Sequence, residues 1–459
     1  MTISGATPQP NSWLHRLIRF VILTLVRLFY PHIEIRGVEH LPADRPVIVV
    51  SNHPNGLIDP IVLMLGLNRP VSFLAKSTLF GNPFGRTFME AFQALPVYRP
   101  QDAGKPGGPQ GSDVKTRNEE TFARGGALLQ QGGAIALFPE GTTHSGTRLL
   151  QMRTGAARMA LGAEQATGWR LGLQLVPIGL WYQSKIHFRS SILLVVGQPF
   201  GLADEAAAYA ADEQQTVRDV TRRIEAGLAQ VVLQAENDEL LAAIPTVAAW
   251  VAPAGQALSL PQQHEWAARL LAAYERLQQT DPARLEAIAE QARRYAGALQ
   301  TLGIKNPWAL ELPEANRRRL VWLVLLLLLT SPLALLGFIL SYGPYRLAGP
   351  IATRAVGPYD TQISTIKLIG GAVLVLLGWL VEAILIGLWL GSWWGLLLLL
   401  VAPPAAYVAL RWGEARVKLQ ELAAYDWLRL RSGDLVQALI AQRQALARQV
   451  MEAVQTVSV

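Results

Sequence analysis

Residues 47–60 read VIVVSNHPNGLIDP, in which four β-branched residues lead directly into a polar, turn-forming segment. A short apolar run bounded by turn residues is typical of a buried strand. After this strand, further strand-like runs alternate along the chain with stretches of helical composition. The strand-like runs lie at 134–138, 173–182 and 191–197, and the helical stretches at 119–131 and 154–164. This alternation predicts an α/β domain over residues 33–202.

The first candidate pair for chemistry is His53 and Asp59, which follow the strand at 47–50. An Asp that accepts a hydrogen bond from one ring nitrogen of a His fixes the tautomer and leaves the other nitrogen free to take a proton. This is the base-and-orienter half of a catalytic triad without its serine, whose place a substrate hydroxyl could take. Taken alone, the pair fits a capping or structural role equally well.

The second candidate segment is FPEGTTHSGTRLLQMRTGAARMAL at 138–161, which also follows a strand-like run. Backbone N–H groups around Glu140 and Gly141, with a helix after them, could cradle an anion. Arg148, Arg153 and Arg158 follow, and arginine is suited to bidentate phosphate binding. The alternative is a solvated helix start with ordinary surface arginines.

Composition indicates a chain that lies partly in lipid. Hydrophobic residues make up 51% and charged residues 16%, against roughly 25% charged residues in soluble domains. With so much apolar sequence, the net charge of +7 favours anionic lipid headgroups as partners, and not nucleic acid. The chain has no cysteine, which excludes disulfides, thiolate metal sites and a Cys nucleophile.

The N-terminal region, residues 1–32, is expected to combine a loose polar tail at 1–11 with a helix at 12–30. Arg16, Arg19 and Arg27 interrupt the apolar residues of this helix. The charge-free run from Phe20 to Val26 is too short to span a bilayer, which favours an interfacial helix with snorkelling arginines. The alternative is a core helix of the next domain. No signal-peptide pattern is seen at this end.

The remainder of the chain divides by composition into three further parts. Residues 203–316 predict a soluble helical appendage of about four helices, broken near Pro253, Pro261 and Pro282. Residues 317–410 predict a transmembrane region: 320–341 suffices for one crossing, and the tract 368–410 for two with a turn near 391–395. Residues 411–459 predict amphipathic helices, and 100–112 a surface loop.

Two smaller segments complete the pattern: LPVYR at 95–99, preceded by Lys76, and VPIGLWY at 176–182. Together NHPNGLID, LPVYR, FPEGTTHS and VPIGLWY occur in the order and spacing of the glycerol-phosphate / lysophosphatidate acyltransferase family. The chain resembles that family over roughly residues 35–200.

The resemblance implies an α/β domain with a mixed sheet covered by helices. It also implies transfer of an acyl group from acyl-CoA or acyl carrier protein to a hydroxyl of glycerol-3-phosphate or lysophosphatidate, with no metal and no further cofactor. His53 would be the general base and Asp59 its orienter. Glu140 would organise the acceptor pocket, and Arg99 with the basic residues after Gly141 would hold the phosphate. The full set of substrate-binding residues expected is Asn55, Lys76, Arg99, Glu140, Gly141, Thr142, Arg148 and Arg153.

Two departures from the common family pattern narrow the resemblance. Five residues separate His53 from Asp59 where four are usual, and Thr143 stands where an Arg is usual. Both changes, with RTGAARMAL at 153–161, resemble the eukaryotic glycerol-3-phosphate / dihydroxyacetone-phosphate acyltransferases. Glycerol-3-phosphate is therefore an expected acceptor, and Arg148 or Arg153 must substitute for the missing Arg.

Three other functions fit parts of the sequence. A catalytically silent lipid-binding protein would not need His53, Asp59 and Glu140 together. A CoA-independent transacylase would take its acyl group from a phospholipid. A metal-dependent hydrolase using His53, Asp59 and His144 would need a fuller ligand shell than the sequence offers.

Charge distribution predicts an even number of membrane crossings. Arginines at 317–319 place the start of the first span in the cytoplasm, where the thioester and the phosphorylated acceptor occur, so the α/β domain should lie there too. Arg411, Arg416 and Lys418 favour the same side for the C-terminal tail. One apolar piece should therefore be re-entrant or interfacial, and Pro403 and Pro404 point to the end of 392–410.

Single cysteines in this cysteine-free chain test that topology. Ser4→Cys, Ser341→Cys and Ser458→Cys are labelled with an impermeant thiol reagent in intact cells, and we expect the two terminal positions to be protected together. Labelling of Ser458→Cys from outside, with Ser4→Cys protected, would establish three crossings instead.

Overall fold

The structure is a computed structural model that describes residues 12–67, 69–109, 114–251, 257–311, 317–356 and 360–455. The chain forms two compact units, one of residues 1–234 with 358–368 and one of 235–357 with 369–459. The tail expected at 1–11, part of the loop expected at 100–112 and the break expected near Pro253 lie outside the described residues.

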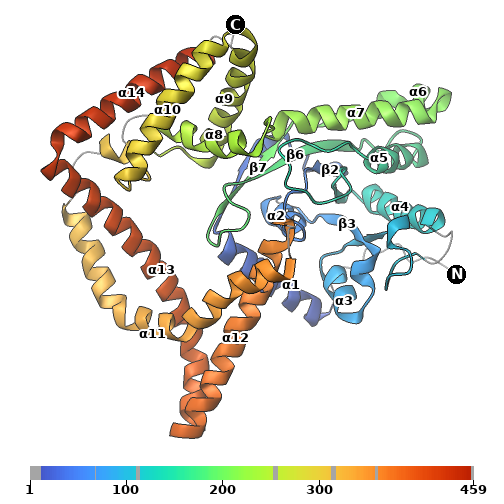
Figure 1. Ribbon diagram of the computed structural model, residues 1–459. Helices are drawn as coiled ribbons and strands as arrows, with labels where there is room; N and C mark the ends of the chain where they lie inside the picture. Colours follow the sequence, from blue (N-terminus) through green and yellow to red (C-terminus); the bar gives the residue numbers. More distant parts are fainter. Residues whose placement is uncertain are drawn as a thin grey trace. The chain divides into compact units, whose positions relative to one another are not determined.

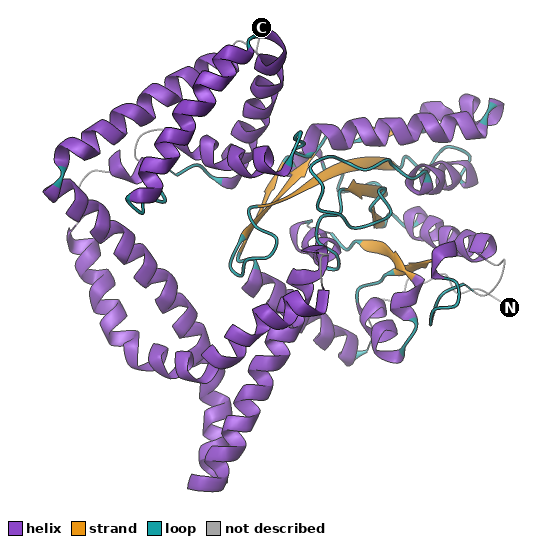
Figure 2. Cartoon of the chain, viewed as in Figure 1, coloured by secondary structure: helices purple, strands orange, loops and turns teal. Residues whose placement is uncertain are grey.

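The first unit is built on a single mixed sheet (Figures 1 and 2). Its strands in the described residues are β1 His32–Arg36, β2 Val47–Ser51, β3 Ser72–Lys76, β4 Leu95–Val97, β5 Ala134–Leu137, β6 Gln174–Tyr182, β7 Ser191–Val196 and β8 Phe200–Gly201. The order is β1-β7-β6-β2-β5-β3-β4, with β8 beside β6. The neighbours from β6 to β4 run parallel, whereas β7 and β8 are antiparallel to β6. The expected mixed sheet is thus confirmed.

Helices cover both faces of this sheet (Figure 1). They are α1 Trp13–Phe29, α2 Ile58–Gly66, α3 Pro83–Ala91, α4 Val114–Gln130, α5 Gly155–Ala166, α6 Ala206–Ala211 and α7 Glu213–Val231. Every residue of β2 is buried, which explains its unbroken apolar sequence. Val47 and Val49 face a core that includes Phe29 of α1 and Ile61 of α2, while α5 and α7 pack on the other face.

The first unit extends past the boundary expected at 202, because α7 packs against the sheet. A Cβ atom placed on Gly179 of β6 would come within 2.1 Å of the carbonyl oxygen of Val231. Only a glycine on the strand therefore allows the end of α7 to approach this closely. The helix composition of 203–231 suggested an appendage, but its buried face belongs to the α/β unit.

Helix α1 combines the two alternatives considered for it. Its N-terminal half exposes apolar side chains, with Trp13 at 70% and Phe20 at 68% exposure. Its C-terminal half is part of the core through Val26 and Phe29, which are buried. The helix is therefore anchored to the domain at one end and presents an apolar surface at the other.

The second unit is helical throughout its described residues. Its helices are α8 Asp238–Trp250, α9 Leu260–Thr280, α10 Pro282–Thr301, α11 Arg317–Val356, α13 Ser392–Arg431, α14 Gly433–Gln455 and the part of α12 (Ile363–Leu390) after Leu368. A buried ion pair joins Arg443 of α14 to Glu311. Helix α13 continues through the boundary expected at 410 and through Pro403 and Pro404.

Three of these helices are long and apolar enough to cross a membrane: Leu320–Val356, Ile363–Leu390 and Ser392–Arg431, as judged from length and composition over the described residues. Their exposed apolar side chains fit a lipid environment, and the chain is therefore membrane-associated. Gly391, with φ 104°, separates α12 from α13, which is where the sequence indicated a turn.

Candidate functional site

The sequence motifs meet at one edge of the sheet because they follow parallel strands. His53 comes after β2 and Glu140 after β5, and these strands are parallel neighbours. The end of β6, with Leu180 and Tyr182, reaches the same edge on the other side of β2. In open sheets with parallel strands, sites form at the carboxyl ends of the strands.

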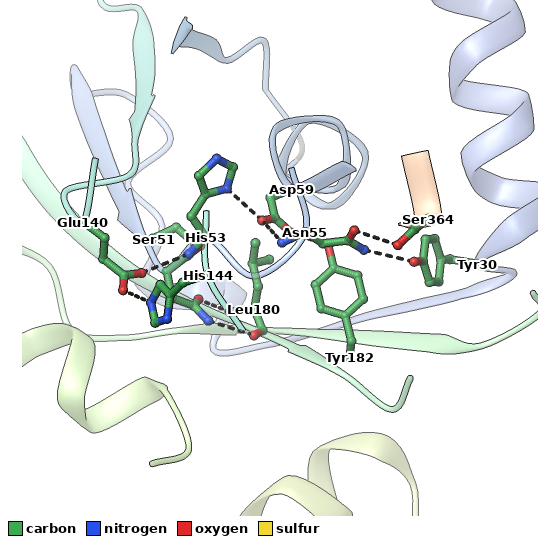
Figure 3. Close-up of polar contacts among 11 residues, drawn as sticks. Tyr30, Ser51, His53, Asn55, Asp59, Glu140, His144, Leu180, Tyr182 and Ser364 are labelled. Carbon is green, nitrogen blue, oxygen red and sulfur yellow. Dashed lines mark hydrogen bonds and ion pairs between the residues drawn. The ribbon is translucent and has the colours of Figure 1, made fainter. Parts of the chain in front are cut away.

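His53 is held by Asp59, as the sequence predicted. Its Nδ1 atom lies 2.8 Å from Oδ2 of Asp59, and Asp59 stands in the first turn of α2, where the helix dipole favours an anion. The imidazole of His53 stacks on Phe138 with ring centroids 4.0 Å apart. Asp59 thus fixes a proton on Nδ1 (Figure 3). Nε2 has no hydrogen-bond partner among the described residues.

The carboxylate of Asp59 is fully buried and bonded at both oxygens. Oδ2 also accepts a hydrogen bond from the backbone N–H of Asn55 at 2.7 Å, and Oδ1 accepts one from the hydroxyl of Tyr182 at 2.5 Å. Burial, reinforced by the negative charge of Asp59, raises the pKa of Tyr182 well above its usual value. Tyr182 therefore stays a neutral donor, and the buried anion is satisfied.

A second buried carboxylate, Glu140, holds His53 from the other side. Oε1 of Glu140 accepts from the backbone N–H of His53 at 3.1 Å, and Oε2 accepts from that of Leu150 at 3.0 Å. Oε2 is also bonded to Nε2 of His144. Because Nδ1 of His144 accepts from the backbone N–H of Gly146, the proton of a neutral His144 sits on Nε2. Both ring nitrogens of His144 thus have hydrogen-bond partners, and the side chain holds the carboxylate of Glu140 in position.

A small cavity of about 40 Å³ opens beside His53 and Glu140. Its polar wall comes from the loop after β5, with His144, Thr147 and Arg148, and its apolar wall from Leu149, Val232 and Leu233. Gly146 also lines the cavity, as do Asn52 and Pro54, the two neighbours of His53 in sequence. Of the arginines in the second motif, Arg148 is the one that reaches this cavity within the described residues.

Arg153 and Gly141 form a packing pair away from the cavity lining. Gly141 has φ 69°, and a Cβ atom there would lie 2.4 Å from Cδ of Arg153. The position therefore requires glycine for its left-handed backbone and for space. The backbone N–H of Arg153 donates to the carbonyl of Pro139 at 2.7 Å. Thr142, between these residues, is exposed.

Asn55 does not take the substrate-binding position expected of it, because its side chain is fully buried on the opposite side of the motif. Its Nδ2 donates to the hydroxyl of Tyr30 at 3.0 Å, and its Oδ1 accepts from the hydroxyl of Ser364 at 2.8 Å (Figure 3). Burial raises the pKa of Tyr30 to about 12, so this phenol also remains neutral and donates to the carbonyl of Lys185.

Arg99 and Lys76 lie at the ends of β4 and β3, outside the cavity lining. The guanidinium of Arg99 pairs with buried Asp102, with Nε 2.7 Å from Oδ2, and Lys105 bonds the other oxygen. Arg99 was expected to hold the acceptor's phosphate, and that expectation stays a prediction, with the guanidinium bonded to Asp102 in this structure. Burial and the positive charge of Arg99 lower the pKa of the Lys76 ammonium.

Several residues of this network were not singled out from sequence. Tyr182 lay within the quoted VPIGLWY segment, and its position at the end of a central strand was the available signal. Asn52, whose side-chain amide bonds both backbone groups of Leu180, belongs to the same motif as His53. Tyr30 and Ser364 are distant in sequence and carried no signal. No three His, Cys, Asp or Glu side chains gather as metal ligands in the described part of the chain.

Comparison with known proteins identifies the family that part of this chain matches. Residues 32–181 match the family described as Acyltransferase. An uncharacterised acyltransferase of Schizosaccharomyces pombe is 24% identical, with 64% of this chain aligned to 55% of the relative. Glycerol-3-phosphate O-acyltransferase 1 of Saccharomyces cerevisiae is 24% identical over 62% of this chain and 48% of its own length. The chain thus spans about half the length of these two relatives.

A bacterial relative is shorter. The 1-acyl-sn-glycerol-3-phosphate acyltransferase of Bacillus subtilis is 26% identical over 38% of this chain and 76% of its own length. The family resemblance expected from the four motifs is confirmed by these matches. Residues 32–181 of this chain are an acyltransferase-family domain whose relatives include glycerol-3-phosphate and 1-acylglycerol-3-phosphate acyltransferases.

Proposed function

We propose that this chain is a membrane-bound O-acyltransferase that moves a fatty acyl group from a thioester to a hydroxyl of a glycerol-phosphate acceptor. The observation that carries the proposal is His53, bonded through Nδ1 to buried Asp59 and lining a cavity with Nε2 unpartnered among the described residues. A fixed tautomer with one accessible nitrogen is what a general base requires.

The chemistry follows from that arrangement. Nε2 of His53 takes the proton of the acceptor hydroxyl as its oxygen attacks the thioester carbonyl. The carbon–sulfur bond then breaks, and the imidazolium returns the proton to the departing thiolate. The carboxylate of Asp59 stabilises the imidazolium between these steps. An ester and a free thiol are the products, and neither a metal nor a further cofactor is needed.

The position of Arg148 supports the proposal that the acceptor carries a phosphate, as glycerol-3-phosphate and lysophosphatidate do. It lies on the cavity next to His53, and a guanidinium can bind a phosphate through two parallel hydrogen bonds. Relatives named for these acceptors are similar in sequence to this chain. Acyl-CoA or acyl carrier protein would supply the thioester.

The exposed end of α1 supports attachment of this domain to a membrane surface. Trp13 and Phe20 are largely exposed, and large apolar side chains interleaved with arginines suit an interfacial helix. With the three apolar helices, this surface would keep the domain at the bilayer, on the cytoplasmic face, where a lipid product can leave directly.

Labelled acyl-CoA with purified, membrane-reconstituted protein tests the proposal. We expect one ester formed for each thiol released, with glycerol-3-phosphate and lysophosphatidate compared as acceptors. His53→Ala should lower the rate by roughly 10²–10⁴-fold because the general base is lost. His32→Ala, which changes an exposed histidine on the edge strand β1, is the matched control.

Two outcomes would contradict this assignment. Transfer from phospholipid without any thioester would establish the CoA-independent transacylase. Activity of His53→Ala within a few-fold of the parent would remove His53 from the mechanism.

Tyr182→Phe tests whether the hydrogen bond from the Tyr182 hydroxyl to Asp59 contributes to the reaction. Removing the hydroxyl leaves Oδ1 of a buried carboxylate without its donor, which costs about 1–3 kcal/mol. We expect kcat to fall roughly tenfold while both KM values stay near those of the parent. Tyr209→Phe, which removes a hydroxyl bonded to Glu213, should leave kcat unchanged. An equal loss in both variants would argue against a role for Tyr182.

Arg148→Ala and Arg153→Ala should separate acceptor binding from packing. Arg148→Ala should raise the KM of the phosphorylated acceptor roughly tenfold or more, because a charge-assisted hydrogen bond is lost, with the thioester KM unchanged. Arg153→Ala should instead lower the Tm, since its side chain packs over Gly141. Arg158→Ala, on the exposed face of α5, is the control. Equal increases in both KM values for Arg148→Ala would indicate a folding role.

A further inference from the structure

The beginning of helix α12 belongs to the α/β unit, although it lies far along the chain. Residues 358–368 are part of the first compact unit, whereas the helix residues after Leu368 are part of the second. A short helical turn, Asp360–Gln362, leads into α12. We call residues 360–368 the docked segment. It packs on the motif that carries His53 and Asp59.

Four contacts hold the docked segment in place. The hydroxyl of Ser364 donates to Oδ1 of Asn55 at 2.8 Å, across 309 positions of sequence. The ammonium of Lys367 donates to the carbonyl of Ile186 at 2.9 Å. Leu368 joins the hydrophobic core of the sheet's first face. A Cβ atom on Gly56 would lie 3.1 Å from the carbonyl oxygen of Thr361, so the backbones meet closely there.

Asn55 connects the docked segment to the candidate general base. Its side chain is shared between Ser364 and Tyr30. Its backbone N–H donates to Oδ2 of Asp59, the same oxygen that lies 2.8 Å from Nδ1 of His53. Both Ser364 and Asn55 have no exposed surface. A chain of three hydrogen bonds therefore runs from Ser364 through Asn55 and Asp59 to His53 (Figure 3).

Helix α12 is long enough to cross a bilayer without the docked segment, which can therefore stay packed on the α/β unit. The apolar helix after Leu368 runs to Leu390, about 22 residues or ~33 Å, which suffices to cross a bilayer. Ser364, Thr365 and Lys367 are thus polar residues at the start of an apolar helix that need not enter the hydrocarbon region. Two of the three have hydrogen-bond partners in the α/β unit.

We propose that Ser364 is a positioning residue for the acyl transfer, supplied to the site by the start of a membrane helix. Its hydroxyl orients the amide of Asn55, which keeps the backbone N–H of Asn55 on Asp59 and so keeps the imidazole of His53 aligned. The inference rests on the proposed function for its effect on rate. The docking of the segment and its hold on Asn55 are independent of that function.

Ser364→Ala in the full, membrane-reconstituted chain tests the effect on rate. The variant leaves Oδ1 of buried Asn55 without its donor, and we expect kcat to fall roughly tenfold with both KM values unchanged. Thr365→Val is the matched control: it alters the next residue of the same helix, whose hydroxyl has no hydrogen-bond partner in the described residues. It should keep the parent's kcat. Equal kcat values for Ser364→Ala and the parent, or equal losses in the two variants, would overturn the proposal.

Hydrogen–deuterium exchange of the same variants tests the docking without an activity assay. Ser364→Ala should speed exchange in the peptide that covers residues 52–60, where the N–H groups of Asn55 and Ile58 are bonded. Thr365→Val should not, and peptides of β7 should be unchanged in both. Unchanged exchange at 52–60 would refute the hold of Ser364 on Asn55. A parent protein that transfers no acyl group but shows the exchange difference would refute the proposed function alone.

Discussion

The carboxylate of Asp59 is the group on which the rest of the site depends. It has no exposed surface, and an unpaired charge in that position would cost far more than a domain's net stability can tolerate. Its donors are the imidazole of His53 and the backbone N–H of Asn55, both in the loop after β2, and the hydroxyl of Tyr182 at the end of β6. The anion is therefore stable only when the strand, the loop and the neighbouring strand are assembled, and that assembly is what aligns His53.

Glu140 gives the site a second constraint of the same kind. It is buried and accepts hydrogen bonds from the backbone of His53 and of Leu150. The two carboxylates thus hold His53 from different elements, one through the ring and one through the main chain. The ring has little freedom between them, and in the proposed reaction a base held in one orientation would lose less entropy when the substrate reacts.

Two elements with apolar surfaces are hydrogen-bonded to the candidate site. Tyr30 follows the helix with the exposed Trp13 and Phe20, and Ser364 belongs to a helix long enough to enter a bilayer. Both side chains bond to Asn55. The residue that bonds Asp59 from behind therefore contacts two elements whose apolar surfaces suit a membrane. Under the proposed function, this arrangement would place the groups that orient His53 next to elements suited to a membrane, where a lipid product would have to leave.

Local pattern was enough to predict the α/β domain, the apolar helices and the His53–Asp59 pair. Burial makes strands such as β2 uniformly apolar, and a His and an Asp six positions apart meet because a loop and a helix start join them. The strands β1, β3, β4 and β8 were not predicted, since short strands carry little periodic signal. Sequence also assigned Asn55 to the substrate, because polar residues in a motif look alike whether they face a ligand or the interior.

Tertiary structure alone decided which of those residues face the cavity and which support it. Asp102 neutralises Arg99, Gly141 gives Arg153 a place to pack, and Ser364 and Tyr30 occupy the amide of Asn55. Folding brings each of these partners together across sequence separations that local patterns do not cover, such as the 309 positions between Ser364 and Asn55. Sequence determined the chemistry available at the sheet edge, because that depends on residue type and local order. Tertiary structure determined its use, because a hydrogen bond depends on distance and burial in space.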